Sequence, residues 1–304
     1  MVLAAPACDD RGMDDRRWLV IGAPMDGSGT GRGERRAPAV LRGHGLADRL
    51  GATDFGDLGV DVADPERDPR TGITGFHDVV HGSRVVRDGV ASAISAGWRP
   101  LVIGGCCSIV PGTLAGVRRE LGPIGLVFVD GHLDLFDGET SGTGELAGMD
   151  LAVLVGHGPP ELTELAGAAP IVDAGDVLAV GDADGARRRQ LNAPGPEAIA
   201  PSLRVIEAAA LEERREEVAS PGSAPYWLHL DVDVLDESVM PAVSYPTRSG
   251  LDWDALERLL EPLARSDRLI GANVTDYNAD RDPDGTAGRR LADLLVRVLG
   301  RDVG

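Results

Sequence analysis

The stretch Leu126-Val127-Phe128-Val129-Asp130-Gly131-His132-Leu133-Asp134 is an apolar run that ends in three side chains of the kind that bind metals. Successive side chains of a β-strand point to opposite faces. If the chain stays extended beyond Val129, then Asp130, His132 and Asp134 share one face. Two carboxylates and an imidazole on one face repel each other or stay hydrated unless a cation lies between them. The stretch therefore predicts a buried strand that leads into a metal site.

A second stretch, Tyr226 to Asp233, repeats this arrangement with Asp231 and Asp233 at its carboxyl end. A single aspartate at such a place is more often a loop cap or a solvated turn. Two clusters after two apolar strands instead indicate a shared metal site. Four carboxylates and one imidazole suit hard or borderline divalent cations, and they carry too much charge for one ion. Two ions that share bridging carboxylates fit better, and such a pair can hold a hydroxide at neutral pH.

Strands and helices alternate along the chain. The apolar runs predict strands at 18–22, 100–103, 125–130, 177–180, 226–233 and 269–274. Helical spacing or composition predicts helices from about 38 and at 79–96, 111–121, 151–155, 207–218, 253–264 and 286–299. Strands that are apolar on both sides are typical of a parallel sheet with helices on both faces. Ligands of such sheets bind beyond the carboxyl ends of the strands.

The remaining segments carry little periodicity. Residues 1–16 predict a disordered N-terminal segment, and residues 17–304 predict a single α/β domain. Residues 52–75 and 190–202 are expected to be irregular. The glycine-rich run Gly27 to Gly33 follows the first strand, but Arg32 stands where a dinucleotide fingerprint needs its third glycine. We therefore interpret this run as a flexible loop at the rim rather than a nucleotide site.

Composition excludes several function classes. The net charge of -19 argues against nucleic acid and anionic membrane surfaces as partners. All 30 basic residues are arginine, so neither a Schiff-base lysine nor a P-loop lysine is present. The 3 cysteines form no disulfide framework, which fits a cytoplasmic protein. No apolar stretch approaches the roughly 20 residues that a membrane helix needs.

Three motifs in order, Gly104-Gly-Cys-Cys-Ser108, Asp130-Gly-His-Leu-Asp134 and Asp231-Val-Asp233, give the chain a family resemblance. It resembles the arginase/agmatinase (ureohydrolase) family, which carries Gly-Gly-Asp-His-Ser, Asp-Ala-His-x-Asp and Asp-x-Asp on strand ends. The similarity extends from about Trp18 to the last helix. The resemblance implies a three-layer α/β/α fold with a mainly parallel sheet, two Mn²⁺ ions and a homo-oligomer (trimer or hexamer). It also implies hydrolysis of a C–N bond in a small guanidino or amidino substrate.

The resemblance further implies a role for each ligand. The two bridging ligands would be Asp130 and Asp231. One metal position would be completed by His132 and Asp233, and the other by Cys107 and Asp134. By the same analogy, Asp134 would orient the attacking hydroxide. The cationic guanidine group would be held by Asp276.

Cys107 departs from the family pattern, which has a histidine ligand there. Thiolate is a soft ligand that prefers zinc, iron or copper over manganese. We therefore expect this metal position to be weak for manganese, empty or filled by another metal. The alternative is that Cys107 is only a small buried apolar residue. A similar cysteine-for-histidine change occurs in the N-hydroxyarginine hydrolase branch, which the chain resembles locally.

The loop Thr143-Gly-Glu-Leu-Ala-Gly-Met149 resembles the Ser-Gly-Asn-x-His-Gly segment of the family, which contacts substrate and shuttles protons. Here Glu145 replaces the asparagine and Ala147 replaces the histidine. A glutamate would repel an α-carboxylate, which disfavours free arginine as a substrate. Glu145 could instead meet a cationic amine, or it could be solvated. We also expect Thr143 and Asp184 to contact the substrate.

Three functions stay open on the sequence. The first is a ureohydrolase-type enzyme that acts on a guanidine or amidine other than arginine. The second is an enzyme of the same fold that hydrolyses another amide C–N bond. The third is a catalytically silent binding protein that kept the fold. Metal content separates the third from the others, and the identity of the product separates the first two.

Overall fold

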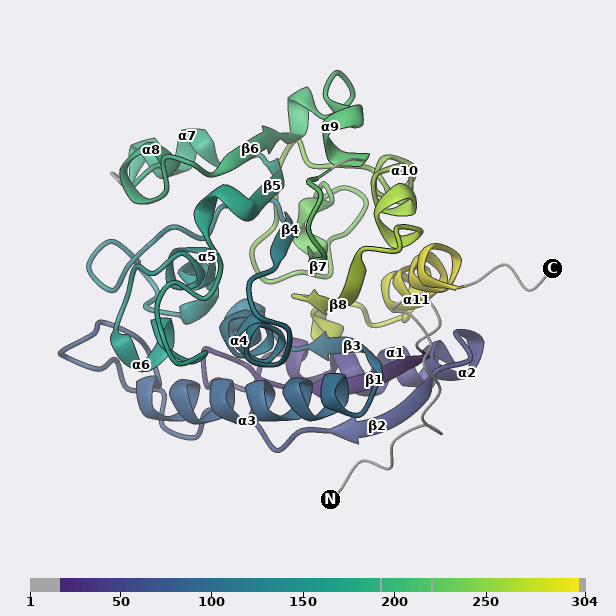
Figure 1. Ribbon diagram of the computed structural model, residues 1–304, viewed down its shortest axis with the longest axis horizontal. Helices are drawn as coiled ribbons and strands as arrows, with labels where there is room; N and C mark the ends of the chain where they lie inside the picture. The colour runs from purple at the N-terminus through teal and green to yellow at the C-terminus, as the bar shows by residue number, and fades with distance from the viewer. Residues whose placement is uncertain (1–16, 192, 220, 301–304) are drawn as a thin grey trace.

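The computed structural model describes residues 17–191, 193–219 and 221–300. The predicted disordered segment at residues 1–16 lies outside the described residues. Within the described chain, eight parallel strands form one sheet in the order β2-β1-β3-β8-β7-β4-β5-β6 (Figure 1). The predicted parallel α/β fold is therefore confirmed. The strands are β1 (Trp18–Ala23), β2 (Thr53–Asp57), β3 (Arg99–Gly104), β4 (Gly125–Val129), β5 (Val177–Asp182), β6 (Arg204–Glu207), β7 (Tyr226–Asp231) and β8 (Leu269–Thr275).

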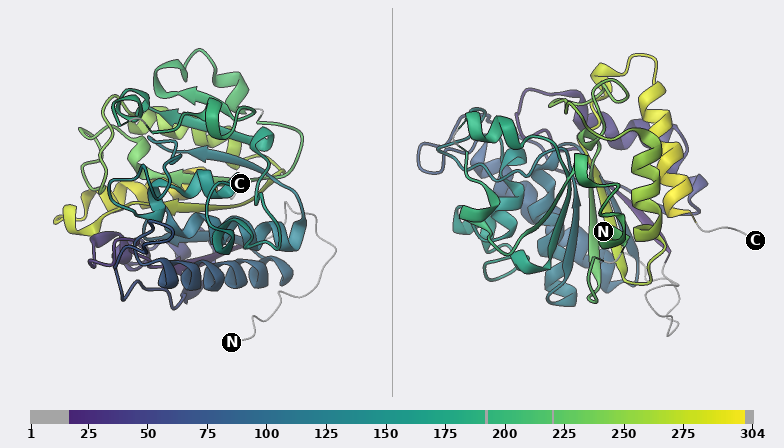
Figure 2. Two further views of the ribbon diagram at one scale, coloured as in Figure 1. Left: turned by 90° about the vertical axis from the view of Figure 1, so that its left-hand side faces the viewer. Right: turned by 90° about the horizontal axis from the view of Figure 1, so that it is seen from above.

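Helices cover both faces of the sheet. In the right-hand panel of Figure 2 the yellow-green α10 and yellow α11 lie on one side of the sheet, and the blue α3 and α4 lie on the other side. The α-helices are α1 (Ala37–Gly43), α2 (Leu46–Arg49), α3 (Phe76–Ser95), α4 (Val110–Leu121), α5 (Asp150–Leu154), α6 (Pro160–Thr163), α7 (Gly185–Gln190), α8 (Pro196–Ile199), α9 (Arg215–Ala219), α10 (Trp253–Ala264) and α11 (Thr286–Leu299). None of the helices described is long and apolar enough to span a membrane.

The sheet separates two hydrophobic cores. Alternate residues of β4 belong to different cores: Val127 and Val129 pack with α10 and α11, whereas Leu126 and Phe128 pack with α3 and α4. All five residues of this strand are buried. A strand with two buried faces needs apolar side chains at every position, which explains the unbroken apolar run.

Several elements differ from the sequence prediction. Residues 52–75, expected to be irregular, contain β2 (Thr53–Asp57), a parallel edge strand whose polar residues are largely exposed. Residues 190–202, also expected to be irregular, contain the short helix α8 (Pro196–Ile199). The predicted helix at residues 207–218 is wrong, because its start is the end of strand β6 (Arg204–Glu207), which is followed by a 3-10 turn (Ala208–Ala210) and the short α9. Both strands lie at the edges of the sheet, where polar side chains tolerate solvent and the apolar signal disappears.

The topology brings four strand ends together. β3, β8, β7 and β4 are neighbours in the middle of the sheet, and all run in the same direction. The residues that follow their carboxyl ends must therefore meet at one edge. Those residues include Cys107, Asp276, Asp233 and Asp130, so the fold itself gathers the ligand-type side chains that the sequence singles out.

Candidate metal centre

The turn after β4 places the first group of ligands. β4 ends at Val129, so the condition for Asp130, His132 and Asp134 to share one strand face, an extended chain beyond Val129, is not met. Instead the Asp130 carboxylate accepts a hydrogen bond from the backbone N–H of His132 at 2.6 Å, which closes a tight turn. Asp134 has a φ of 45°, a conformation that costs energy for a residue with a side chain. The ligands are gathered by this strained turn and not by strand alternation.

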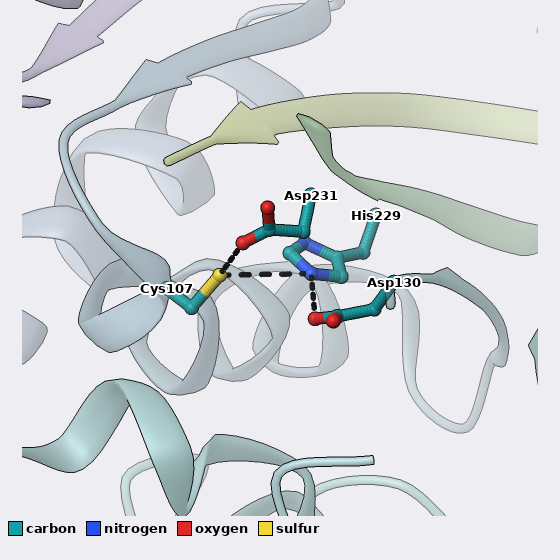
Figure 3. A group of neighbouring side chains, drawn as sticks. All are labelled: Cys107, Asp130, His229 and Asp231. Atoms are coloured by element: carbon teal, nitrogen blue, oxygen red, sulfur yellow. Dashed lines mark hydrogen bonds and ion pairs between the residues drawn. The ribbon is translucent and has the colours of Figure 1, made fainter. Parts of the chain in front are cut away.

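Four clusters of ligand atoms result, each with its atoms within 4.8 Å of one another. They are Cys107–Asp130–His229–Asp231, Cys107–Asp134–Asp150, Asp130–His132–Asp233 and Asp231–Asp233–Asp276. All six residues that we predict to be metal ligands therefore lie together. Four residues each belong to two clusters and link them into one centre, namely Cys107, Asp130, Asp231 and Asp233. Figure 3 shows the first of these clusters.

His132 and Asp233 form the more accessible part of the centre. The His132 Nδ1 atom lies 3.0 Å from an Asp233 oxygen and 3.6 Å from an Asp130 oxygen. Burial is the largest effect and opposes the charged imidazole, but the carboxylates of Asp233 and Asp130 together raise the pKa of His132 well above its usual value. Burial raises the pKa of Asp233 to about 7 even though His132 opposes that rise. Both raised pKa values favour a bound proton at this pair in the absence of a metal ion.

Cys107 has polar surroundings. The residue is 4 % exposed, and its thiol donates to Asp231 at 2.6 Å and lies 3.9 Å from the His229 Nε2 atom (Figure 3). The Thr275 hydroxyl lies 3.0 Å from the same sulfur. Burial, followed by the charge of Asp231, raises the pKa of this thiol well above its usual value. A cysteine that only fills core space needs no such partners. The geometry therefore favours a ligand role over the apolar alternative, and the role stays a prediction.

The buried acids of the centre favour the binding of cations. Burial and neighbouring carboxylates raise the pKa of both Asp134 and Asp231 well above the usual value. One buried oxygen of Asp130, Oδ2, accepts no hydrogen bond, and the His229 Nε2 atom, at 3.7 Å, is too far away to form one. A buried charged oxygen without a donor is strongly unfavourable, whereas divalent ions bind such oxygens well. On chemical grounds this donor set fits two divalent ions.

A cavity of about 290 Å³ opens above the centre. Its floor includes Cys107, His132 and Asp231, and its walls include the predicted substrate residues, which are Thr143, Glu145, Asp184 and Asp276. Its remaining wall includes Arg187 and the half-exposed Leu191. The cavity therefore connects all the predicted substrate residues with the metal ligands.

Glu145 is neither solvated nor free for a cationic amine. It is 6 % exposed, and its carboxylate forms an ion pair with Arg32. The Tyr245 hydroxyl donates to the same carboxylate at 2.7 Å. Arg32 belongs to the glycine-rich loop, where the Asp26 carboxylate accepts the backbone N–H groups of Gly31 and Arg32 at 2.8 and 2.9 Å. This loop therefore lies behind the cavity wall and contacts it through Glu145 and Tyr245, which line the cavity.

Two other acids at strand ends, Asp276 and Asp182, have different partners. Asp276 has a φ of 65°, accepts the Ser244 N–H at 3.2 Å and joins a ligand cluster. Asp182 instead pairs with Arg188 through two hydrogen bonds of 2.7 Å each. Asp182 therefore belongs to no ligand cluster, while Asp276 lies within reach of both the metal ligands and the cavity.

Sequence reasoning missed three residues of this site. His229 lies within a strand two residues before Asp231, on the same side, and that alternation was a usable signal. Asp150 follows a glycine-rich loop and carries no local signal. Arg32 reaches Glu145 across 113 residues of sequence. Only the folded chain relates that pair.

Comparison with known proteins agrees with this geometry. The model of the Arginase family matches residues 16–300. The chain belongs to the arginase family. It is 30 % identical over 297 residues to an arginase of Brevibacillus brevis, with 94 % of this chain and 98 % of that protein covered. The suspected family resemblance is therefore confirmed.

Solved structures of family members show the same fold. The native structure of arginase from Bacillus caldovelox has a TM-score of 0.82 and 25 % identity, covering 95 % of this chain and all (100 %) of the other. The structure of formimidoylglutamase from Bacillus subtilis has a TM-score of 0.72 at 18 % identity, covering 95 % of this chain and 88 % of the other. Proteins named for different reactions thus share this fold, and the substrate must be argued from the cavity.

Proposed function

We propose that this arginase-family chain is a metal-dependent hydrolase that cleaves a guanidine or amidine C–N bond in a substrate other than free arginine. The observation that carries the proposal is the position of the linked ligand clusters on the floor of the cavity of about 290 Å³. The proposed bridging ligands are Asp130 and Asp231. His132 and Asp233 would complete one position, and Cys107 and Asp134 the other.

A bound pair of divalent ions supplies a water-derived nucleophile at neutral pH and stabilises negative charge on the reacting centre. We propose manganese for the position with His132, where oxygen and imidazole ligands suit it. The thiolate of Cys107 favours zinc or iron at the other position. The buried unpartnered oxygen of Asp130 supports cation binding at both.

The residues around the cavity would bind and orient the substrate. Asp276 faces the ligand clusters and would hold the cationic guanidine or amidine group. In this arrangement Asp134, which lines the cavity, would take up the proton of the nucleophile and pass it to the leaving amine. This role matters more than usual because Ala147, which lines the cavity, offers no proton.

The cavity wall around Glu145 and Asp184 supports a substrate without an α-carboxylate. Glu145 already has Arg32 and Tyr245 as partners, so this pair presents no free cation to an anion. Asp184 adds a second acid to the wall, and Thr143 adds a hydroxyl. Arg187 also lines this wall, but it is exposed to solvent and the neighbouring Asp184 offsets part of its charge. Agmatine-like compounds with a cationic or neutral tail therefore fit better than arginine.

The test combines elemental analysis of the purified protein with a screen of guanidino and amidino compounds. We expect two bound divalent ions and release of urea, or of ammonia from an amidine, from a compound other than arginine. Efficient turnover of arginine would contradict the substrate proposal. Absence of stoichiometric metal and of any product would instead support a silent binding protein. Light scattering of the same sample would test the proposed homo-oligomer.

A further inference from the structure

Asp150 is a buried acid beside the proposed centre, and the proposed function assigns it no role. It is the first residue of α5, its side chain is 0 % exposed, and neither carboxylate oxygen has a hydrogen-bond partner. An aspartate at the start of a helix commonly caps it. Here Met149 occupies the capping position and no side chain caps the helix. The ordinary structural role of such an aspartate is therefore absent.

The surroundings of Asp150 consist of ligand-type atoms. Its carboxylate forms a cluster with the Cys107 sulfur and the Asp134 carboxylate, all within 4.8 Å of one another. That cluster contains no basic side chain, so nothing in it compensates two carboxylates and a thiol. Buried charged groups persist when they are paired or bind a metal. Asp134 is also held at a φ of 45°, which turns its carboxylate into the same cluster.

We propose that Asp150 is a third ligand of the metal ion at the Cys107 position, together with Cys107 and Asp134. This proposal rests on the proposed metal pair and deepens it. The position then has one sulfur ligand and several carboxylate oxygens, including those shared from Asp130 and Asp231. A thiolate with hard oxygen ligands suits a borderline divalent ion, and we assign zinc.

His229 is the competing candidate, because its imidazole lies in the neighbouring cluster. Its tautomer follows from a buried chain of hydrogen bonds. The Trp227 indole N–H can only donate, and it donates to the Asn273 Oδ1 atom at 2.7 Å. The Asn273 amide therefore presents its NH₂ group to the His229 Nδ1 atom at 2.7 Å. Nδ1 must accept, so the proton of the neutral ring is on Nε2.

This tautomer makes His229 a donor rather than a ligand. The Nε2 atom faces the centre, 3.7 Å from an Asp130 oxygen and 3.9 Å from the Cys107 sulfur. A protonated ring nitrogen has no lone pair for a metal. Its N–H can instead stabilise the Cys107 thiolate or orient Asp130. His229 is thus a positioning residue. Asp150 is the remaining candidate for the third ligand at the Cys107 position.

The proposal is tested by zinc titration and by cobalt substitution in the full-length protein. Cobalt bound to thiolate gives a charge-transfer absorption, which reports on the Cys107 position without any substrate. We expect two ions and this absorption in the wild type. We expect Asp150→Asn to weaken the ion at the Cys107 position at least tenfold and to lose the absorption, while the other ion stays. The matched control is Asp184→Asn, a cavity acid outside the clusters, which should keep both ions.

His229→Gln separates the two candidates, because glutamine can keep an N–H donor. We expect it to keep both ions and the cobalt absorption, whereas His229→Leu should shift the absorption to lower energy through loss of the donor. Unchanged zinc affinity in Asp150→Asn would overturn the proposal. Loss of one ion in His229→Gln with retention in Asp150→Asn would make His229 the ligand. If Asp150→Asn does not fold, Asp150→Ser takes its place with the same expectations.

The outcomes also separate this proposal from the proposed function. A wild type that binds two ions with the cobalt absorption but hydrolyses no guanidino or amidino compound contradicts only the function. An active two-metal wild type whose Asp150→Asn variant binds zinc normally contradicts only the role of Asp150. A wild type that binds no metal contradicts both.

Discussion

The Arg32 guanidinium forms an ion pair with the Glu145 carboxylate, which lines the cavity, across 113 residues of sequence. The Arg32 side chain also lies over the Tyr245 ring, 5.5 Å from its centroid. Burial opposes the charge of Arg32, but Glu145 and Glu34 outweigh it and raise the pKa of the guanidinium. The acid that the sequence suggests would repel an anionic substrate is therefore locally neutralised.

Removal of the Glu145 charge should shift substrate preference toward anions. In Glu145→Gln the Arg32 guanidinium would lose a partner and attract a substrate carboxylate. We expect the ratio of kcat/KM for a carboxylate-bearing guanidino compound over agmatine to rise about tenfold, or roughly 1.4 kcal/mol. Steady-state kinetics on both compounds measure this ratio, with the exposed loop acid variant Glu139→Gln as the control. An unchanged ratio would remove the ion pair from substrate selection.

Asp231 should be required at both metal positions. It belongs to the cluster with Cys107 and to the cluster with Asp276. We expect Asp231→Ala to bind neither ion, measured by elemental analysis after gel filtration. Asp254→Ala, on the exposed start of α10, should bind as the wild type does. Full metal occupancy of Asp231→Ala would show that the carboxylate does not bridge.

Cys107→His tests the thiolate directly. Imidazole suits manganese better than sulfur does, so we expect this variant to bind a second manganese more tightly and to hydrolyse its substrate faster. The larger ring must replace a side chain that is only 4 % exposed. If Cys107 is a packed core residue, overpacking should cost about 1–3 kcal/mol of stability with no gain in manganese. Manganese stoichiometry and melting temperature of the same variant separate these results.

The central part of the fold could be predicted from the sequence because its signal is local. β3, β4, β7 and β8 are buried on both faces, so each needs an apolar run that composition reveals. The edge strands β2 and β6 are partly exposed and carry polar residues. Their place in the sheet depends on pairing with a neighbour that is far away in sequence.

The residues of the candidate site also fall into two groups, those that the local sequence reveals and those that depend on the folded chain. Asp130, His132 and Asp231 stand next to apolar strands, and their residue types and spacing alone suggest metal ligands. The turn that strains Asp134 could not be predicted, because it depends on tertiary contacts and has a φ of 45°. Asp150 reaches the centre from the start of α5, and Arg32 reaches Glu145 from the glycine-rich loop. Only the folded chain defines these positions.

Arg188 should be important for stability but not for metal binding. It is buried and makes two hydrogen bonds of 2.7 Å to the buried Asp182. Removal of one partner leaves a buried charge, which typically costs about 3–5 kcal/mol. We expect urea unfolding of Arg188→Ala to show a loss of this size with unchanged metal stoichiometry. The control is Arg189→Ala, which removes an exposed neighbour, and an equal loss there would attribute the effect to the helix instead of the pair.

The pH dependence of stability should change sign when metal binds. The pKa of Asp233 is raised to about 7 in the folded protein, chiefly by burial. Its unfolded value is near 3.8, so between these two pH values the folded chain holds a proton that the unfolded chain has lost. Stability that depends on this proton is fully present below about pH 4 and is lost as the pH rises through about 7. The raised pKa of His132 acts in the same direction.

Chelated protein should therefore unfold at lower urea concentration at pH 8.5 than at pH 6, by on the order of a few kcal/mol. Metal must displace the same proton, so metal affinity should rise over this range and level off above about pH 8. Urea unfolding with EDTA and metal titration at each pH measure the two effects. Asp233→Asn cannot titrate at this position and should flatten the stability profile. A chelated wild type that becomes more stable between pH 6 and 8.5 would show that the His132–Asp233 pair does not hold the proton in the metal-free centre.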